Sequence, residues 1–95
     1  KIKVRKQITR DEKEIELFVD GVFVEAGGIP NNSYLPKDVI TNSLGEIITD
    51  KEGKTNIPGL FAAGDVTDGK NKQVIIAAGE GAVAALTAHD YLLRN

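Results

Sequence analysis

Apolar and charged residues alternate near the beginning of the chain. Ile2 and Val4 alternate with basic residues. Ile15 and Leu17 alternate with glutamates, and Phe18 follows them. The stretch between these two groups, residues 9–13, is polar throughout. Alternation with a period of two on both sides of a polar link is typical of a β-hairpin with one solvated face. The pattern therefore predicts a small antiparallel hairpin.

Three short segments that contain consecutive apolar residues follow, at residues 22–24, 46–49 and 60–63, each bounded by residues that favour turns. Runs of this length predict strands, and the first and third have the continuous apolar character of buried ones. Glycine and proline in residues 27–32 predict an irregular crossing between the first two runs, and the charged residues 50–54 predict a turn. The crossing glycines are interpreted as turn geometry rather than ligand contacts.

A long apolar segment from about Gln73 to Leu93 predicts a helix. Between Val74 and Ala88 its only charged residue is Glu80, which we expect on a solvated face of the helix. A helix that is apolar nearly all round is buried on most sides. We therefore expect the rest of a longer protein, a second subunit or a cofactor to cover it.

Two glycines, Gly79 and Gly81, stand inside the predicted helix. Each costs about 1 kcal/mol relative to alanine in a helix interior. Such a cost predicts that another backbone or a ligand passes close to them. His89, the one histidine, stands beside Asp90 near the helix end, where the helix dipole favours a cation, and we expect it to be a structural surface residue.

Composition and charge exclude several classes of function. A 41% apolar content supports a packed core, and a net charge of −2 with scattered basic residues argues against nucleic acid or an anionic membrane as partner. The sequence has no signal peptide and no apolar run near the roughly 20 residues of a membrane span, so we expect a cytoplasmic protein. The absence of cysteine excludes disulfides and thiolate chemistry in this chain. The absence of methionine, position 1 included, favours a piece of a longer chain.

The chemistry-bearing residues gather in residues 55–65, where a Pro-Gly turn leads into a short apolar run that ends at Gly64 and Asp65. Ligands of open α/β folds bind at the carboxyl ends of strands. A glycine there lets the backbone approach a ligand, and a carboxylate accepts hydrogen bonds from sugar-like hydroxyls. The alternative is that Asp65 only caps the loop that follows the strand.

The string T-x-x-P-G-x-F-A-A-G-D at these positions resembles the second flavin-binding motif of flavoprotein reductases with two dinucleotide-binding domains. In that family the aspartate holds the ribityl chain of FAD, and its backbone amide lies near the phosphate. The resemblance therefore implies that Gly64 and Asp65 bind FAD.

Residues 71–81 resemble the segment that follows this motif in thioredoxin reductases and in the flavoprotein of alkyl hydroperoxide reductase. There a basic residue, a glutamine and a small or apolar residue begin a helix beside the isoalloxazine ring, and they match Lys72, Gln73 and Val74, although the family more often has Arg and Ala at the outer two positions. A helix N-terminus offers free amides and about half a positive charge, which at the N1/C2=O edge would stabilise the reduced flavin. Lys72 as a solvated loop residue and Gln73 as an ordinary first-turn residue remain alternatives.

Residues 20–31 resemble the segment in which such reductases leave the NADPH domain and re-enter the FAD domain, except that Gly27-Gly28 stands where a single glycine is usual. The resemblance implies an α/β fold: a fragment of a three-layer FAD/NAD(P)-binding domain with a small antiparallel β-hairpin and one long C-terminal helix. Residues 1–19 would be a remnant of the NAD(P)H-binding domain, and residues 20–95 the C-terminal part of the FAD-binding domain.

The sequence lacks the first FAD motif, its NADPH equivalent and the redox C-x-x-C of this family. We therefore expect no catalytic residue and no metal site here, an inactive chain when alone, and FAD in the complete protein with NAD(P)H bound elsewhere. The expected partners are the remainder of a reductase chain or a second subunit, a thioredoxin-like protein, and a second copy in a homodimer. The alternative is a non-catalytic module, or a subunit of a split reductase, that acts by protein–protein association.

Overall fold

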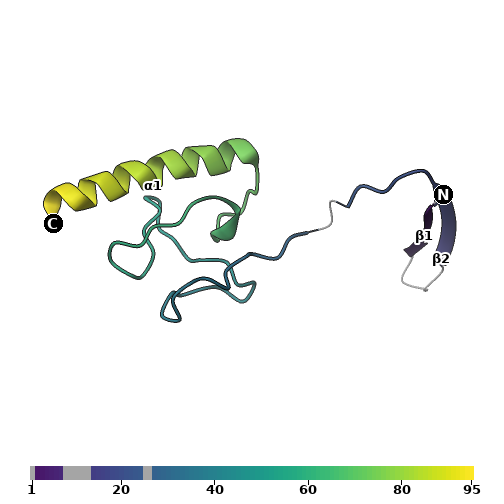
Figure 1. Ribbon diagram of the computed structural model, residues 1–95, viewed down its shortest axis with the longest axis horizontal. Helices are drawn as coiled ribbons and strands as arrows, with labels where there is room; N and C mark the ends of the chain where they lie inside the picture. The colour runs from purple at the N-terminus through teal and green to yellow at the C-terminus, as the bar shows by residue number, and fades with distance from the viewer. Residues whose placement is uncertain (1, 8–13, 25–26) are drawn as a thin grey trace.

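The computed structural model describes residues 2–7, 14–24 and 27–95 (Figure 1). Two strands come first, β1 (Ile2–Gln7) and β2 (Glu14–Val19). A short 3-10 turn, η1 (Gly64–Val66), and one long helix, α1 (Val74–Arg94), complete the regular elements of this described part. The polar link predicted at residues 9–13 lies outside the described residues.

Strands β1 and β2 pair in an antiparallel manner, with Ile2 opposite Val19 and Val4 opposite Leu17. In this register each of the two named residues of β1 stands directly across from its partner in β2. The pairing lies where the alternating pattern predicted a hairpin.

The prediction of a buried strand at residues 22–24 is wrong. This segment has no strand structure, and the side chain of Phe23 is 95% exposed. A strand needs a neighbour to receive its backbone hydrogen bonds, and no segment in the described part of the chain pairs with this one. Its apolar side chains therefore remain in solvent.

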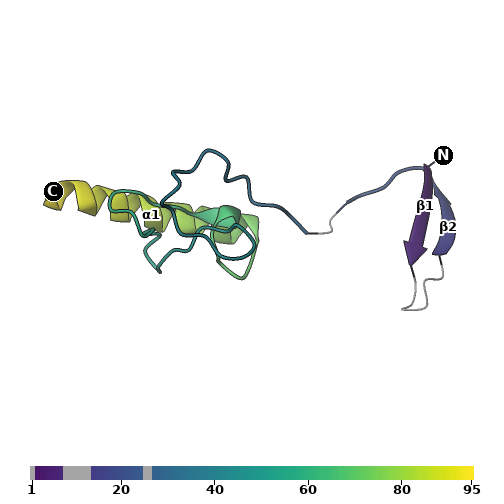
Figure 2. The same ribbon diagram turned by 90° about the horizontal axis from the view of Figure 1, so that it is seen from below.

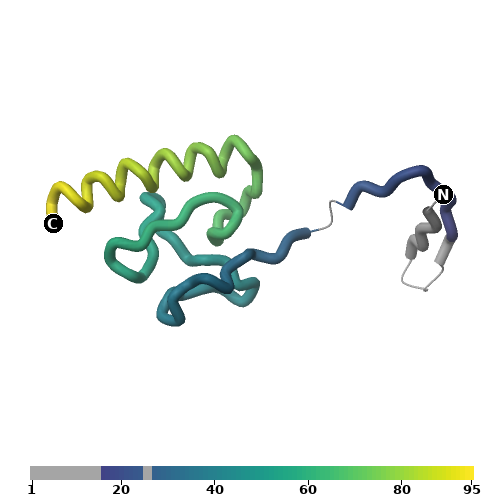
Figure 3. The backbone as a smooth tube through the Cα atoms, viewed as in Figure 1, coloured from purple at the N-terminus to yellow at the C-terminus, as the bar shows by residue number. Residues whose placement is uncertain are grey.

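The strands predicted at 46–49 and 60–63 are reduced to single bridges. Ile47 pairs with Thr41 on one side and Thr67 on the other, and Phe61 pairs with Lys54. Each bridge is short because the chain turns at once on either side of it, as the irregular path of this region shows (Figure 3). The predicted turn at 50–54 is present, with the Gly53 amide donating to the Asp50 carbonyl at 3.1 Å.

The core of the described chain is small. Ile47 is 2% exposed, its amide donates to the Val66 carbonyl, and its carbonyl accepts from the Asp68 amide. Val39 and Ala84 are the other buried apolar residues. Ala84 belongs to α1, whose later turns pack on the loops through an edge-to-face contact between Tyr91 and Phe61, with ring centroids 5.9 Å apart. The helix thus lies along one side of the loop region (Figures 1 and 2).

The predicted helix is confirmed, and the described residues of this chain cover little of it. Val74 is 89% exposed, Leu86 is also exposed, and Ala84 is the one buried residue of α1. No described atom lies within 4 Å of the positions that a Cβ would take at Gly79 or Gly81, so no described backbone passes close to them. Among the described residues, no helix has the length and hydropathy needed to cross a membrane.

Candidate functional site

An open cavity of about 1020 Å³ lies between the irregular crossing and the segment that leads into α1. It is lined by Gly27, Gly28, Ile29, Pro30, Asn31, Tyr34, Ser43, Leu44, Glu46, Asp65, Val66 and Lys72. Two of the predicted site residues, Asp65 and Lys72, therefore share one cavity. Gly27 has a φ of 71°, which agrees with the predicted turn geometry, and it also forms part of the cavity wall.

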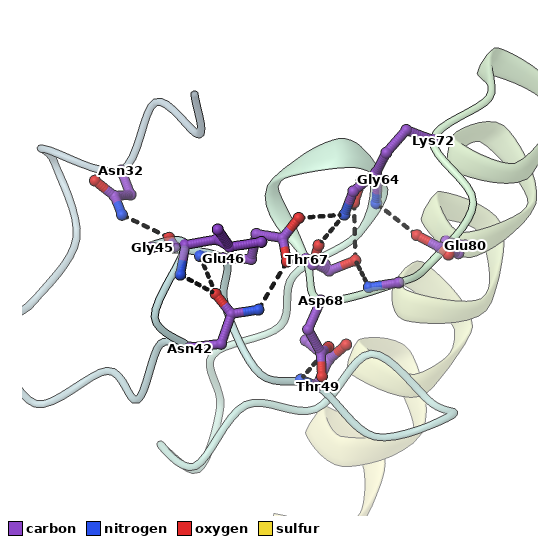
Figure 4. Close-up of polar contacts among 12 residues, drawn as sticks. Asn32, Asn42, Gly45, Glu46, Thr49, Gly64, Thr67, Asp68, Lys72 and Glu80 are labelled. Carbon is purple, nitrogen blue, oxygen red and sulfur yellow. Dashed lines mark hydrogen bonds and ion pairs between the residues drawn. The ribbon is translucent and has the colours of Figure 1, made fainter. Parts of the chain in front are cut away.

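Gly64 is held through both of its backbone polar groups (Figure 4). Its amide donates to Oε2 of Glu80 at 2.8 Å, and its carbonyl accepts from Oγ1 of Thr67 at 2.8 Å and from the Thr67 amide at 3.0 Å. With a φ of 82° it adopts a left-handed conformation that side chains disfavour, and a Cβ there would stand 3.4 Å from Cβ of Ala77. The turn that carries Asp65 is thus fixed by α1 and by the loop together.

Asp65 is the middle residue of this turn and is exposed along the cavity. Its carboxylate receives no hydrogen bond from the residues that the structure describes, whereas nearby Asp68 accepts one from the Thr49 amide at 3.1 Å. Asp65 therefore does not cap its loop. All its acceptor capacity is available to a ligand with hydroxyl groups.

Lys72 is an exposed loop residue whose ammonium group is nevertheless paired within the chain. Its Nζ lies 3.0 Å from Oε1 of Glu46 and donates to the Thr67 carbonyl, and the two paired side chains are 33% and 15% exposed. Asn42 donates to the other carboxylate oxygen of Glu46 at 2.7 Å. The hydrogen bond from Asn42, and then that from Lys72, lower the pKa of Glu46 against the opposing effect of its partial burial.

Gln73 and Val74 occupy the beginning of α1 and lie outside the cavity wall. Gln73 is the N-cap residue, with extended backbone angles and no capping hydrogen bond from its side chain, and its carbonyl accepts from the Ala77 amide at 2.9 Å. The first turn also has no acidic side chain. Because the first amides of a helix have no partner within it, this end of α1 offers hydrogen-bond donors and partial positive charge next to Lys72.

Three residues of the site were not predicted from the sequence. Glu80 is half-buried and bonded to the Gly64 amide, so its expected placement on a solvated face is wrong. Its isolation as a charge in an apolar helix was the signal that pointed to a special role. Glu46 and Asn42 gave no such signal, because they meet Lys72 only through the folding of distant segments.

His89 is exposed on α1, as predicted for a surface residue. The described residues form no group of three or more His, Cys, Asp or Glu side chains that could hold a metal ion.

Residues 1–81 match the family described as pyridine nucleotide-disulphide oxidoreductase. The match spans most of the chain, which therefore belongs to the pyridine nucleotide-disulphide oxidoreductase family.

Curated relatives agree with this assignment. One subunit of the alkyl hydroperoxide reductase of Staphylococcus aureus is 57% identical over 79 residues, which cover 83% of this chain and 16% of the relative. A protein named NADH dehydrogenase from Bacillus subtilis is 55% identical over 87 residues, which cover 92% of this chain and 17% of that protein. The chain thus spans about a sixth of the length of these relatives.

Solved structures show which fold the chain has. The thioredoxin reductase of Lactococcus lactis superposes with a TM-score of 0.84 at 33% identity, over 98% of this chain and 31% of that one. The thioredoxin reductase of T. acidophilum gives a TM-score of 0.82 at 36% identity, over 96% and 30% of the two chains. The chain therefore has part of a thioredoxin-reductase-like α/β fold.

Proposed function

We propose that this chain is the FAD-contacting C-terminal portion of a thioredoxin-reductase-like, NAD(P)H-dependent flavoprotein oxidoreductase. The observation that carries the proposal is the cavity in which the unpartnered carboxylate of Asp65 and the cation of Lys72 lie close to the uncapped beginning of α1. Membership of the pyridine nucleotide-disulphide oxidoreductase family supports it.

The donor and acceptor groups at this site fit the two parts of FAD that they would contact. Asp65 would accept hydrogen bonds from the hydroxyls of the ribityl chain, and the left-handed turn at Gly64 lets the backbone lie close to it. Lys72 and the first amides of α1, from Val74 onward, would face the electron-rich edge of the ring, with Gln73 setting the angle at which the helix begins.

FAD, when bound, supplies the ring that accepts a hydride from NAD(P)H and passes electrons to a disulfide. The residues of this chain bind and orient it. Lys72 and the helix amides would stabilise negative charge at the ring edge, because fixed donors in a site from which water is partly excluded need little reorganisation. In this proposal no residue of the chain exchanges a proton with the substrate.

The proposal also assigns the two parts of the chain. Residues 1–19 would belong to the NAD(P)H-binding domain, and residues 20–95 would complete a three-layer FAD-binding domain. The open strip at Gly79 and Gly81 and the exposed side chain of Phe23 support this, since a larger domain would cover them. The pyrophosphate site would come from outside this sequence, which has no G-x-G-x-x-G, so the chain alone would be inactive.

The complete protein would pass electrons to a thioredoxin-like or other disulfide protein and would form a homo-oligomer. The names of the relatives support the first point, and the exposed apolar residues of α1 support the second. Light scattering over a range of protein concentrations tests the oligomer, and a monomer at all of them would contradict it.

The proposed function is tested by measuring the Kd for FAD of an Asp65→Ala variant, made in the complete protein to which the chain would belong. Losing hydrogen bonds to an ionised acceptor costs about 1.5–3 kcal/mol, so the Kd for FAD should rise by at least about ten-fold. Asp38→Ala, at another exposed aspartate outside the cavity, is the matched control and should leave the Kd unchanged. Equal FAD affinity in the Asp65 variant and the wild type would refute the proposed role.

A further inference from the structure

We infer that Glu80 is a positioning residue for the flavin site, which acts by fixing the turn that presents Asp65. The inference rests on the proposed function and adds to it a residue outside the FAD-contacting set. Glu80 is among the residues that line a second cavity, of about 360 Å³, and it is not among those that line the larger cavity beside Asp65. In this inference it acts through the Gly64 amide and not by touching the cofactor.

The contact is made through one glycine. Oε2 of Glu80 accepts the Gly64 amide at 2.8 Å, and Asp65 is the next residue in the chain. On its other side the Gly64 carbonyl accepts two hydrogen bonds from Thr67, which is 2% exposed. With both backbone groups of Gly64 bonded, the direction in which the chain enters Asp65 is set.

The helix contacts this glycine at two points on one face. Ala77 lies beneath it, with its Cβ 3.4 Å from the position of a Gly64 Cβ, and Glu80 stands three residues further along. Residues three apart share a helix face. The turn is therefore seated on α1 itself, and the carboxylate of Asp65 and the first amides of α1 keep a fixed separation.

The choice of an acid supports a role beyond helix formation. Glu80 is the one charge between Val74 and Ala88, and a half-buried carboxylate loses part of its hydration. Its hydrogen bond to a backbone amide is charge-assisted and offsets that loss. An apolar residue would serve the helix equally well, but would leave the Gly64 amide without this acceptor.

The experiment measures the Kd for FAD of the complete protein carrying Glu80→Ala or Glu80→Gln, each with Asp65 intact and with Asp65→Ala. Glu80→Ala should raise the Kd about ten-fold, which corresponds to about 1.4 kcal/mol. Glu80→Gln keeps an oxygen acceptor and should restore the Kd to within about two-fold. With Asp65 removed, Glu80→Ala should add little, since coupled residues are not additive. Asp90→Ala, an exposed acid of the same helix, should have no effect.

Two results of the binding measurements would overturn the inference. One is an equal effect of Glu80→Ala with and without Asp65, and the other is a Glu80→Gln variant that binds FAD as weakly as Glu80→Ala. Failure of the proposed function looks different, because Asp65→Ala alone would then leave the Kd unchanged. If Glu80→Ala does not fold, amide-resolved hydrogen exchange of the wild-type and Glu80→Gln proteins provides a second test. The Gly64 amide should exchange slowly in both, and exchange as fast as that of exposed Gly28 would overturn the inference.

Discussion

Gly64 meets one steric demand, which comes from its backbone conformation. Its φ of 82° lies in the left-handed region, where a Cβ crowds the backbone, and a Cβ there would be in ordinary contact with Ala77 of α1. This conformation could not be read from the sequence alone, although a glycine before an aspartate at the end of an apolar run marked the position. The site depends on this glycine because its own amide and carbonyl are both held by hydrogen bonds.

Replacing Gly64 by alanine should lower the free energy of unfolding by about 1–2 kcal/mol, the cost of a left-handed conformation for a residue with a Cβ. Urea unfolding followed by circular dichroism measures this change. Gly21→Ala is the matched control, because Gly21 has no left-handed φ and no atom within 4 Å of its Cβ position. Equal free energies of unfolding for Gly64→Ala and Gly21→Ala would show that the turn at Gly64 accepts a side chain without strain.

The residues near Asp65 in sequence were the ones that the motif predicted, and the structure places Asp65 and Lys72 in one cavity. Glu46 escaped prediction because a pairing between distant segments leaves no local pattern. Glu80 was misplaced because helical periodicity tells which residues share a face, but not that a loop will cross that face.

At the scale of elements, the pair of Glu46 and Lys72 joins the loop around Asn42 to the segment that begins α1. Lys72 also donates a hydrogen bond to the carbonyl of Thr67. Its strength depends on ionised Glu46, whose pKa is lowered in the folded state. A lowered pKa means that the folded state holds this proton less tightly than the unfolded state, so protonation favours unfolding.

The stabilising effect of Glu46 should therefore be fully present above its ordinary pKa of about 4.3 and be lost as the pH falls through the lower folded value. Glu46→Gln should be less stable than wild type near neutral pH, and the difference should shrink as the solution is acidified below about pH 4. Unfolding curves in urea at several pH values measure it. Asp50, whose pKa is also lowered, titrates in both proteins and cancels in the comparison. A difference that does not change with pH would contradict the pairing.

Element prediction succeeded where the signal was local and failed where it was not. Helix α1 follows from its long apolar composition, and the observed bounds, Val74–Arg94, differ by one residue at each end from the expected ones. The segments 46–49 and 60–63 have strand composition, but a strand also requires a partner over several residues. Each segment pairs through one residue only, Ile47 or Phe61.

At the scale of the whole molecule, little of the apolar surface is buried. Within residues 16–24 and 27–95, the buried apolar residues are Val39, Ile47 and Ala84. A larger set of apolar side chains is exposed. The exposed set includes Phe23, Val24, Ile29, Leu44, Val74, Ile75, Leu86, Leu92 and Leu93. The thioredoxin reductases that share this fold are about three times as long, and in the proposed function the remaining part of such a protein covers these residues.

The central claim concerns where the flavin is held, and the visible absorption and intact mass of the native protein test it most directly. We predict a chain well above 10.2 kDa that carries flavin absorption bands, and a 95-residue chain that stays colourless after FAD is added and the excess removed. A native protein of 10.2 kDa would contradict the claim. If that protein took up FAD and oxidised NAD(P)H, the site would be complete in this chain; if it stayed colourless, the chain would be a non-catalytic module.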